Sequence, residues 1–415
     1  MFLVLSPKRN DETEVKKNEM YAYYASYSQS FAMHMLKSQK LGSDSLVIDP
    51  WNGSGTTTYA SSLIGYKSIG LDLNPAMTVI AQARQSGKND INSAKLALNK
   101  LTSNFKGKIN SSDPLNNWFT SDSVDNIRKI EKFILGKAQG ESVSGKIAFI
   151  KNEKAILYLS LFKTIRFLLS SFIPSNPTWI KLAKGNDEKV SISWIELKKI
   201  FIRSSIESCD ILDKGNDFIK YPLIVNGSSK NIPLDDESVD FVLSSPPYCT
   251  RIDYAVATFP ELALLCSCSK EIKLIRRALM GTTTVPKSII GNAAFGKTCN
   301  EFLGDVFTHD SRASSTYYFK NFHQYFSDLS MSIKELSRVI KRNSKCVLVV
   351  QDSYYKNIHC NLPKIIIEMC REYDLEHLNT VEFISKRNMA NINSKSKKYR
   401  NHKVAIECVL TFIKG

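Results

Sequence analysis

A glycine-containing turn follows an acid in the stretch LVIDPWNGSGTT, residues 46 to 57. Gly53 and Gly55 allow the backbone to bend tightly and a ligand to approach closely, and Thr56 is placed to begin a helix. Such a helix start presents backbone N–H groups and the positive end of a helix dipole to a ligand. A P-loop would need a lysine after its second glycine. This turn has none, so it predicts a less phosphorylated ligand than a nucleoside triphosphate.

A second acid, Asp72, stands 19 positions after Gly53, at the end of the next apolar run. Nucleotide-binding sheets place an acid here to accept hydrogen bonds from ribose hydroxyls. A dinucleotide fingerprint would read GxGxxG, whereas position 58 is Thr58, which disfavours NAD and FAD. A glycine turn alone is purely structural about as often as it binds a ligand. The acid after the second run favours a nucleoside ligand.

A third cluster, Ser245, Pro246, Pro247 and Tyr248, directly follows the apolar run DFVLS. Two prolines cannot continue a central strand, so the chain must leave the sheet at its carboxyl edge, where ligands bind in open α/β sheets. Proline carries no N–H, which leaves carbonyl oxygens as acceptors beside a flat aromatic ring. Such a pocket suits a planar base with an exocyclic amine. The alternative is a strand terminator with a packed tyrosine.

The three stretches DPWNGSGTT, GLDLNP and SSPPY, in this order, resemble the S-adenosylmethionine-dependent amino-methyltransferases of DNA. The hallmarks of that family are DPFxGSGTT and (Asp/Asn/Ser)-Pro-Pro-(Tyr/Phe/Trp). The similarity covers roughly residues 20–85 and 222–266, and more loosely 317–352 and 404–414. The pair of motifs is specific, whereas either motif alone would be modest.

The resemblance implies S-adenosylmethionine as the cofactor. Asp72 would take its ribose hydroxyls, and the family's N-terminal cofactor segment would fall near YASYSQSFAMHML, although its usual His-Pro start is missing. Trp51 replaces the family's phenylalanine. Ser228 stands where the family often has an aspartate that contacts the adenine, a departure that could weaken cofactor affinity. The residues implied around the cofactor are Ser30, Phe31, Asp49, Pro50, Gly53, Ser54, Gly55, Thr56 and Asp72.

The resemblance also implies a catalytic role for Ser245, Pro246, Pro247 and Tyr248. The Ser245 hydroxyl and the Pro246 carbonyl would accept the N–H protons of the target amine, and Tyr248 would stack on a base flipped out of double-stranded DNA. No metal is required. Serine before the prolines favours cytosine N4 over adenine N6 within the family. RNA base methylation uses the same pocket chemistry, and a non-catalytic nucleic-acid-binding scaffold is a further alternative.

The residues after this motif are open to two interpretations. Arg251, Asp253 and Tyr254 follow at once and are predicted either to shape the pocket or to have structural roles.

Composition is consistent with a nucleic-acid partner. Lys and Arg total 56 against 40 Asp and Glu, a formal charge of +16, which favours a polyanion such as DNA over a merely basic proteome. Nine cysteines without a CxxC pair predict reduced thiols, and a charged start without a signal peptide predicts a cytoplasmic protein. A restriction or defence-system partner protein fits such an enzyme. No membrane role is expected.

Short runs rich in Val, Ile and Leu must position these residues. They predict buried strands of a mostly parallel sheet at 45–49, 68–72, 222–226, 240–245, 345–352 and 405–413. Helical patterns separate several of them, notably at 317–342. The predicted fold class is α/β, a Rossmann-like methyltransferase sheet with a large helical insertion.

At 415 residues the chain is long enough for a main domain and a second module. We predict a first methyltransferase part at 20–85, a helical insertion for target recognition or partner contact at 86–220, and a second methyltransferase part at 221–415. Within it, 280–316 is predicted as a long irregular loop, and 386–403 as a basic loop that contacts phosphates or is merely solvated.

The apolar stretch 155–173 is nearly long enough to span a bilayer. It carries Lys163 and Arg166 near its middle, where each charge would cost about 2.5–3.5 kcal/mol on insertion scales. We therefore predict a buried or partner-facing helix.

Overall fold

The structure is a computed structural model of the chain. It describes residues 4–8, 21, 27–104, 111–136, 143–148, 150–174, 178–215, 218–249, 252–289, 295–385 and 405–415.

Within these residues, seven strands form one sheet in the order β3-β2-β1-β4-β5-β9-β8. The first five are parallel, while β9 runs antiparallel to both β5 and β8. The strands are β1 (Leu46–Asp49), β2 (Lys67–Asp72), β3 (Leu223–Asn226), β4 (Val239–Ser244), β5 (Ile340–Gln351), β8 (Leu375–Ser385) and β9 (Ala405–Lys414), with a separate hairpin of β6 (Ser353–Tyr355) and β7 (Ile358–Cys360).

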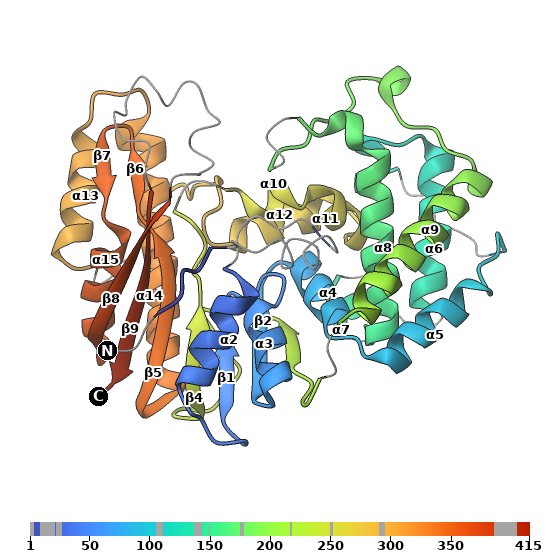
Figure 1. Cartoon of the computed structure of the whole chain (residues 1–415). Helices are drawn as coiled ribbons and strands as arrows, with labels where there is room; N and C mark the ends of the chain where they lie inside the picture. The colour runs from blue at the N-terminus through green and yellow to red at the C-terminus, as the bar shows by residue number, and fades with distance from the viewer. Residues whose placement is uncertain are drawn as a thin grey trace.

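Helices cover both faces of this sheet, because the side chains of its central strands alternate in direction. Val47 and Leu243 pack with α2 (Gln29–Ser38) and α3 (Thr56–Ile64) on one face. Ile48 and Val242 pack on the other face with α13 (Lys297–Thr308), α14 (Phe319–Val339) and α15 (Leu362–Arg371) (Figure 1). The predicted Rossmann-like methyltransferase sheet is confirmed.

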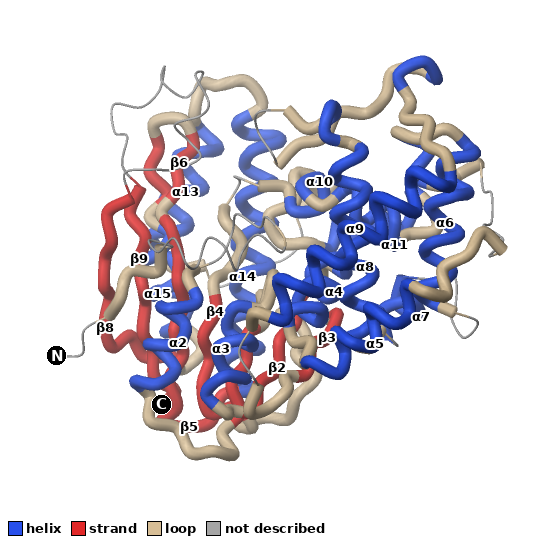
Figure 2. Tube along the Cα trace, turned by 45° about the vertical axis from the view of Figure 1, so that its right-hand side comes forward, coloured by secondary structure: helices blue, strands red, loops and turns tan. Residues whose placement is uncertain are grey.

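Helices dominate the chain between β2 and β3, and they share an apolar core of their own. Figure 2 shows them gathered on one side of the molecule, with the strands on the other. They are α4 (Pro75–Arg84), α5 (Lys88–Leu98), α6 (Ser121–Leu135), α7 (Val143–Ala148), α8 (Asn152–Leu168) and α9 (Trp194–Asp213), with the 3-10 turns Pro114–Asn117, Ser170–Phe172 and Asn186–Glu188. The function of this lobe and its limits at 86 and 220 remain predictions.

A further helical segment follows β4 and packs on the same lobe. It consists of α10 (Tyr254–Ala257), α11 (Phe259–Leu265) and α12 (Ser269–Ala278). Figure 1 shows these helices above the ends of the central strands, between the sheet and the helical lobe. The segment therefore lies at the carboxyl edge of the sheet.

The six predicted strands are confirmed, but three further strands, β6, β7 and β8, were missed. The predicted helix 317–342 ends at Val339, and β5 starts directly after it, at Ile340. The interpretation of 280–316 as a long loop was wrong in part, because this stretch holds α13 and a π-helical turn, Ser314–Tyr318. In α13, Cys299, Phe302, Leu303 and Val306 are buried. That spacing is helical, but Gly, Ser and Asn residues around it hid the signal.

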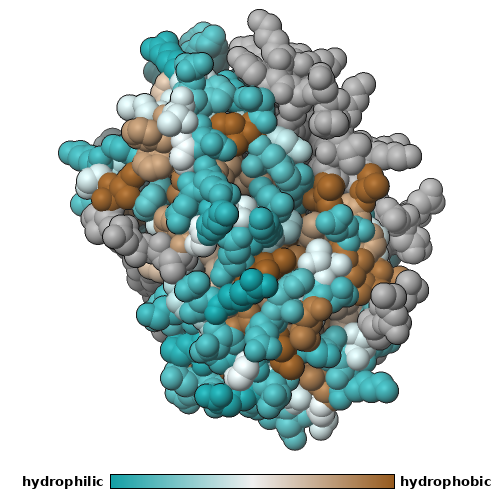
Figure 3. Space-filling view, turned by 90° about the vertical axis from the view of Figure 1, so that its left-hand side faces the viewer, coloured by the Kyte–Doolittle hydropathy of each residue, from teal (hydrophilic) through white to brown (hydrophobic). Residues whose placement is uncertain are grey.

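Strand β8 was missed because it lies at the edge of the sheet and mixes polar with apolar residues. Its Leu378 and Ile384 are exposed. Figure 3 shows the side of the molecule on the left of Figure 1, where hydrophobic residues lie in groups on a largely hydrophilic surface. The basic stretch 386–403 lies outside the described residues, so its contact with phosphates stays a prediction.

The apolar stretch 155–173 forms most of α8, which is largely buried. Its Arg166 forms a two-pronged ion pair with Glu261 of α11, at 2.6 and 2.8 Å between nitrogen and oxygen. In the described part of the chain, no helix is both long and apolar enough to cross a membrane. Among the described residues no disulfide joins any of the nine cysteines, and all of them except Cys268 are buried.

Candidate active site

The glycine turn joins β1 to α3 and is bonded to the acid at the end of β2. Gly53 and Gly55 have φ angles of +50° and +83°, which L side chains rarely adopt. The Gly53 N–H donates to one carboxylate oxygen of Asp72 at 2.8 Å, and the Asn74 N–H donates to the other at 2.8 Å. The turn therefore binds a carboxylate of the chain itself, and it fixes Asp72 in place.

A second glycine makes room for this turn. A Cβ atom at Gly70 of β2 would lie only 2.4 Å from the side chain of Asn52. The Asn52 backbone N–H also donates to the Leu71 carbonyl at 2.9 Å. Close contact between the turn and β2 therefore depends on glycine at position 70.

Asp49, at the end of β1, is buried, and its carboxylate is engaged by hydrogen-bond donors of the protein itself. Its side chain accepts hydrogen bonds from the hydroxyls of Ser244 and Thr57 and from the Trp51 N–H, at 2.5, 2.6 and 3.1 Å. Burial raises the pKa of Asp49 to about 6, and these donors offset only part of that rise. The residue ties β1, β4 and the start of α3 together.

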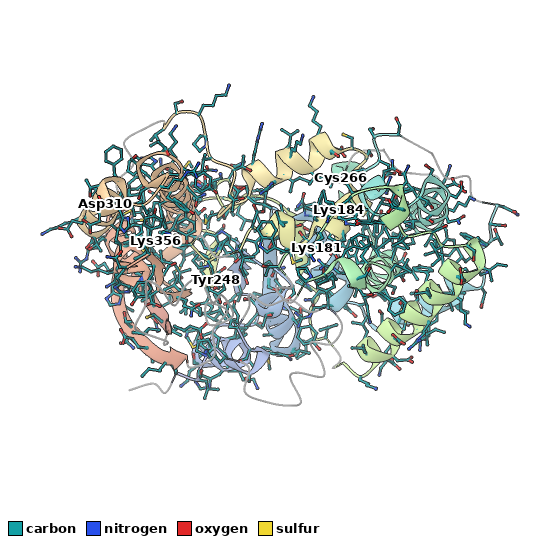
Figure 4. The ribbon with its side chains drawn as sticks, turned by 90° about the horizontal axis from the view of Figure 1, so that it is seen from above. Lys181, Lys184, Tyr248, Cys266, Asp310 and Lys356 are labelled. Carbon is teal, nitrogen blue, oxygen red and sulfur yellow. The ribbon has the colours of Figure 1, made fainter. Side chains whose placement is uncertain are left out.

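One cavity at the carboxyl edge brings the two motifs together. The predicted residues that line it are Pro50, Asp72, Ser245, Pro246, Pro247 and Tyr248. Figure 4, a view from above, labels Tyr248 near the middle of the molecule. Residues from the ends of β1, β2 and β4 therefore face one space.

The other predicted cofactor residues do not line this cavity. Ser30 is exposed and bonds Ser28, whereas Phe31 is fully buried in the core under α2. The Ser54 carbonyl and hydroxyl accept hydrogen bonds from Arg84 of α4. Asp49, Gly53, Gly55 and Thr56 shape the turn. Contact of these residues with a cofactor stays a prediction.

Hydrogen bonds hold the Ser-Pro-Pro-Tyr segment from several sides. The Ser245 hydroxyl donates to the Val349 carbonyl of β5 at 2.8 Å. The Tyr325 hydroxyl of α14 donates to the Pro247 carbonyl at 2.8 Å, and the Tyr248 N–H donates to the Tyr254 hydroxyl at 3.2 Å. Because Ser245 gives its proton to the backbone, its oxygen lone pairs are left to accept.

The Pro246 carbonyl is the second acceptor at this bend. Among the described residues, no protein donor bonds it, unlike the Pro247 carbonyl that Tyr325 engages. A hydroxyl oxygen and a carbonyl oxygen from adjacent residues thus border one cavity with an aromatic ring. This arrangement can bind a planar group that carries an N–H₂.

Several cavity residues were not predicted from the sequence. Tyr254, which was predicted either to shape the pocket or to have a structural role, lines the cavity. Of its two neighbours with the same alternatives, Asp253 caps α10, and Arg251 lies outside the described residues. Leu279 and Met280 also line the cavity; Met280 begins the stretch 280–316 that was interpreted as an irregular loop, and Leu279 directly precedes that stretch. Only proximity in the fold identifies these residues, because nothing in their types indicates a site.

The cavity is acidic on the side of β2. Burial raises the pKa of Asp72 to about 6, which the Asn74 and Gly53 N–H groups partly offset and the nearby Asp49 reinforces. Asp72 is partly exposed and lines the cavity. Above pH 6 its carboxylate can accept hydrogen bonds from ligand hydroxyls.

Comparisons with known proteins relate the chain to methyltransferases over most of its length. The chain is 24% identical over 389 residues to Type II methyltransferase M.MvaI of Kocuria varians, which covers 86% of this chain and 81% of the relative. It is 20% identical over 389 residues to Type II methyltransferase M.BsoBI of Geobacillus stearothermophilus, covering 84% and 73%. The chain is similar to Type II methyltransferases. No protein-family model matches it.

The likeness to Type II methyltransferases covers most of the chain in both cases, so it extends well beyond the two short motifs. Among solved structures, the YcgJ protein of Bacillus subtilis matches 92% of this chain and 97% of its own length, with 10% identity and a TM-score of 0.33.

Proposed function

We propose that this chain is a DNA methyltransferase that transfers a methyl group from S-adenosylmethionine to the exocyclic amine of a flipped base, with cytosine N4 as its preferred target. One observation carries the proposal: Asp72 of the glycine-turn side and Ser245 to Tyr248 of the β4 exit line a single cavity. The similarity to Type II methyltransferases supports it. A restriction or defence-system partner protein fits the proposal.

The residues at the β1 and β2 ends fit this cofactor. Asp72 can accept the ribose hydroxyls, and Pro50 and Trp51 form the adjoining wall. Within the described residues, the buried Nε1–H of Trp51 has no acceptor, which leaves a donor for a ligand. S-adenosylmethionine, when bound, supplies a methyl group already activated by a sulfonium.

The residues at the β4 exit fit the amine. Its lone pair is delocalised into the ring of the base, which makes the nitrogen a poor nucleophile. If the Ser245 oxygen and the Pro246 carbonyl accept hydrogen bonds from its two N–H groups, the nitrogen moves toward tetrahedral geometry and its lone pair turns to the methyl donor. Positioning and charge stabilisation then provide most of the catalysis.

Loss of the aromatic ring at position 248 is expected to weaken catalysis. Tyr248→Ala removes stacking on the flipped base, which is worth about 1–3 kcal/mol, so methyl transfer should fall roughly 10- to 100-fold. Tyr248→Phe keeps the ring and should retain most activity. The measurement is transfer of tritiated methyl groups to duplex DNA. Near-full activity of the alanine variant would remove the stacking role.

Cofactor binding is expected to depend on the charge of Asp72. Its folded-state pKa of about 6 exceeds the ordinary value of 3.8, so the native state holds this proton more tightly and stability falls as pH rises between these values. Below pH 6 the carboxyl group is mostly neutral, and a neutral carboxyl accepts hydrogen bonds from ribose hydroxyls poorly. Calorimetry should show S-adenosylmethionine affinity falling up to about tenfold per pH unit below that point. A flat affinity from acidic to neutral pH is the opposing result.

The identity of the methylated nucleoside shows which atom of the base receives the methyl group. DNA methylated by the enzyme, digested to nucleosides and analysed by mass spectrometry, should contain N4-methylcytosine. N6-methyladenine alone would preserve the methyltransferase assignment and overturn the cytosine preference. Label in RNA but not in DNA would overturn the choice of substrate.

A further inference from the structure

Helix α12 has one strongly basic exposed face. Lys270, Lys273, Leu274 and Arg277 are exposed along it, while Ile272 is buried on the opposite side. The spacing i, i+3, i+4 and i+7 places the exposed residues on one side of the helix. We propose that Lys270, Lys273 and Arg277, here called the α12 basic face, bind the phosphate backbone of duplex DNA beside the flipped base. This inference rests on the proposed function.

The position of α12 relative to the cavity supports this role. The helix ends at Ala278, and Ala278, Leu279 and Met280 line the cavity that Ser245 and Tyr248 also line. In Figure 1 the helix lies between the sheet and the helical lobe, above the ends of the central strands. A duplex that delivers a base to this cavity must therefore pass close to α12.

The cations of the α12 basic face are not neutralised by the protein. Among the described residues, Lys270, Lys273 and Arg277 form no ion pair, whereas the neighbouring Arg276 pairs with Asp253 at 2.9 Å. The acid of the same helix, Glu271, accepts a hydrogen bond from the Ser267 N–H at 2.7 Å. Three cations within about 10 Å along the helix axis match the rise of about three base pairs.

Hydrogen bonds fix both ends of α12 before any ligand binds. Near its C-terminus, Arg276 bonds the hydroxyl of Thr283 at 2.8 Å, and both residues bond Asp253. Before its N-terminus, the Cys266 carbonyl accepts a hydrogen bond from the buried Arg128 at 3.4 Å. A fixed helix loses little conformational freedom on binding, so its charges are suited to holding a phosphate backbone in register.

The salt dependence of DNA binding tests this inference. Lys273→Gln with Arg277→Gln removes two proposed phosphate contacts, whereas Lys37→Gln with Lys40→Gln removes two exposed charges shortly before β1, at the opposite edge of the sheet. The probe is a fluorescent duplex of mixed sequence and about 30 base pairs, titrated between about 50 and 200 mM salt. The α12 variant should lower the slope of log K against log salt by about 1.8, and the control variant should leave it unchanged.

The outcomes separate this inference from the proposed function. Equal slopes for the two variants, or greater loss of binding to single-stranded RNA than to the duplex, would overturn the role of α12. Retained S-adenosylmethionine binding in both variants would show that the fold is intact. If the wild-type protein binds the duplex but transfers no methyl group, the proposed function fails while the slopes still report on α12.

Discussion

Ser245→Ala is expected to lower kcat for methyl transfer by about 100- to 1,000-fold, comparable to the loss of one preorganised hydrogen-bonding group at a reaction centre. The Ser245 hydroxyl donates to the Val349 carbonyl at 2.8 Å, so its oxygen can only accept from the amine. Alanine removes this acceptor and leaves the second acceptor, the Pro246 carbonyl, in place. The affinity for S-adenosylmethionine should be unchanged, because that ligand is expected on the β2 side of the cavity.

Two controls make the Ser245 result specific. Ser245→Asn keeps an acceptor oxygen at the position and should retain more activity than the alanine variant. Ser353→Ala removes the hydrogen bond from a serine hydroxyl to the Cys249 carbonyl, at 3.2 Å, without touching the proposed acceptors. Ser353→Ala should lower kcat for methyl transfer by less than about tenfold. Equal losses in Ser245→Ala and Ser353→Ala would show that Ser245 only supports the backbone.

Arg128→Met is expected to destabilise the protein by about 3–5 kcal/mol, because it breaks a buried ionic network on one side only. Arg128 is 8% exposed. Its guanidinium donates to Asp113 at 2.8 and 2.9 Å, to Glu131 at 2.6 Å, and to the Ala263 carbonyl of α11 at 3.0 Å. Removing it leaves two carboxylates and carbonyls of the α11 end with fewer donors.

The same network makes the helical lobe sensitive to acid. Burial alone would raise the pKa of Glu131, but Arg128 and Lys146 together hold it below its ordinary value of 4.5. A lowered folded-state pKa contributes stability that is present above this value and lost as pH falls below it. Arg128→Met should reduce that acid sensitivity.

Urea unfolding measures the loss in the free energy of unfolding that Arg128→Met causes, with Arg203→Met as the matched control. Arg203 pairs with Glu207 one helical turn away, but its side chain is 79% exposed. Exposed pairs contribute about 0–1 kcal/mol, so the control should unfold close to the wild type. If the two variants unfold within about 1 kcal/mol of each other, the network does not secure α11. Methyl transfer should also fall in Arg128→Met, because α11 leads into α12, whose last residue, Ala278, lines the cavity.

The sequence was sufficient to predict the layers of the fold and both ends of the proposed site. The strands that end at Asp49, at Asp72 and directly before Ser245 are short and mostly apolar and buried, so their hydrophobic runs decide their structure locally. Edge strand β8 was missed, because it is only partly buried and its pattern is mixed.

The contacts that hold the site could not be predicted, because they join residues far apart in the chain. Tyr325 holds the Pro247 carbonyl from 78 positions away, and the Val349 carbonyl takes the Ser245 proton across 104 positions. Asp49 was predicted as a cofactor residue, and its donors from β4 and α3 became visible only once the strands were paired. Side-chain roles of this kind depend on packing rather than on local pattern.

The central claim is that the glycine-turn side and the β4 exit form one active cavity for methyl transfer to a DNA base. The most direct test incubates the purified protein with S-adenosylmethionine carrying a tritiated methyl group and with unmethylated duplex DNA. We predict label in the DNA, found as N4-methylcytosine, and its loss in Ser245→Ala although that variant still binds the cofactor. Absence of label in both DNA and RNA, from wild-type protein that is folded and binds S-adenosylmethionine, would contradict the claim.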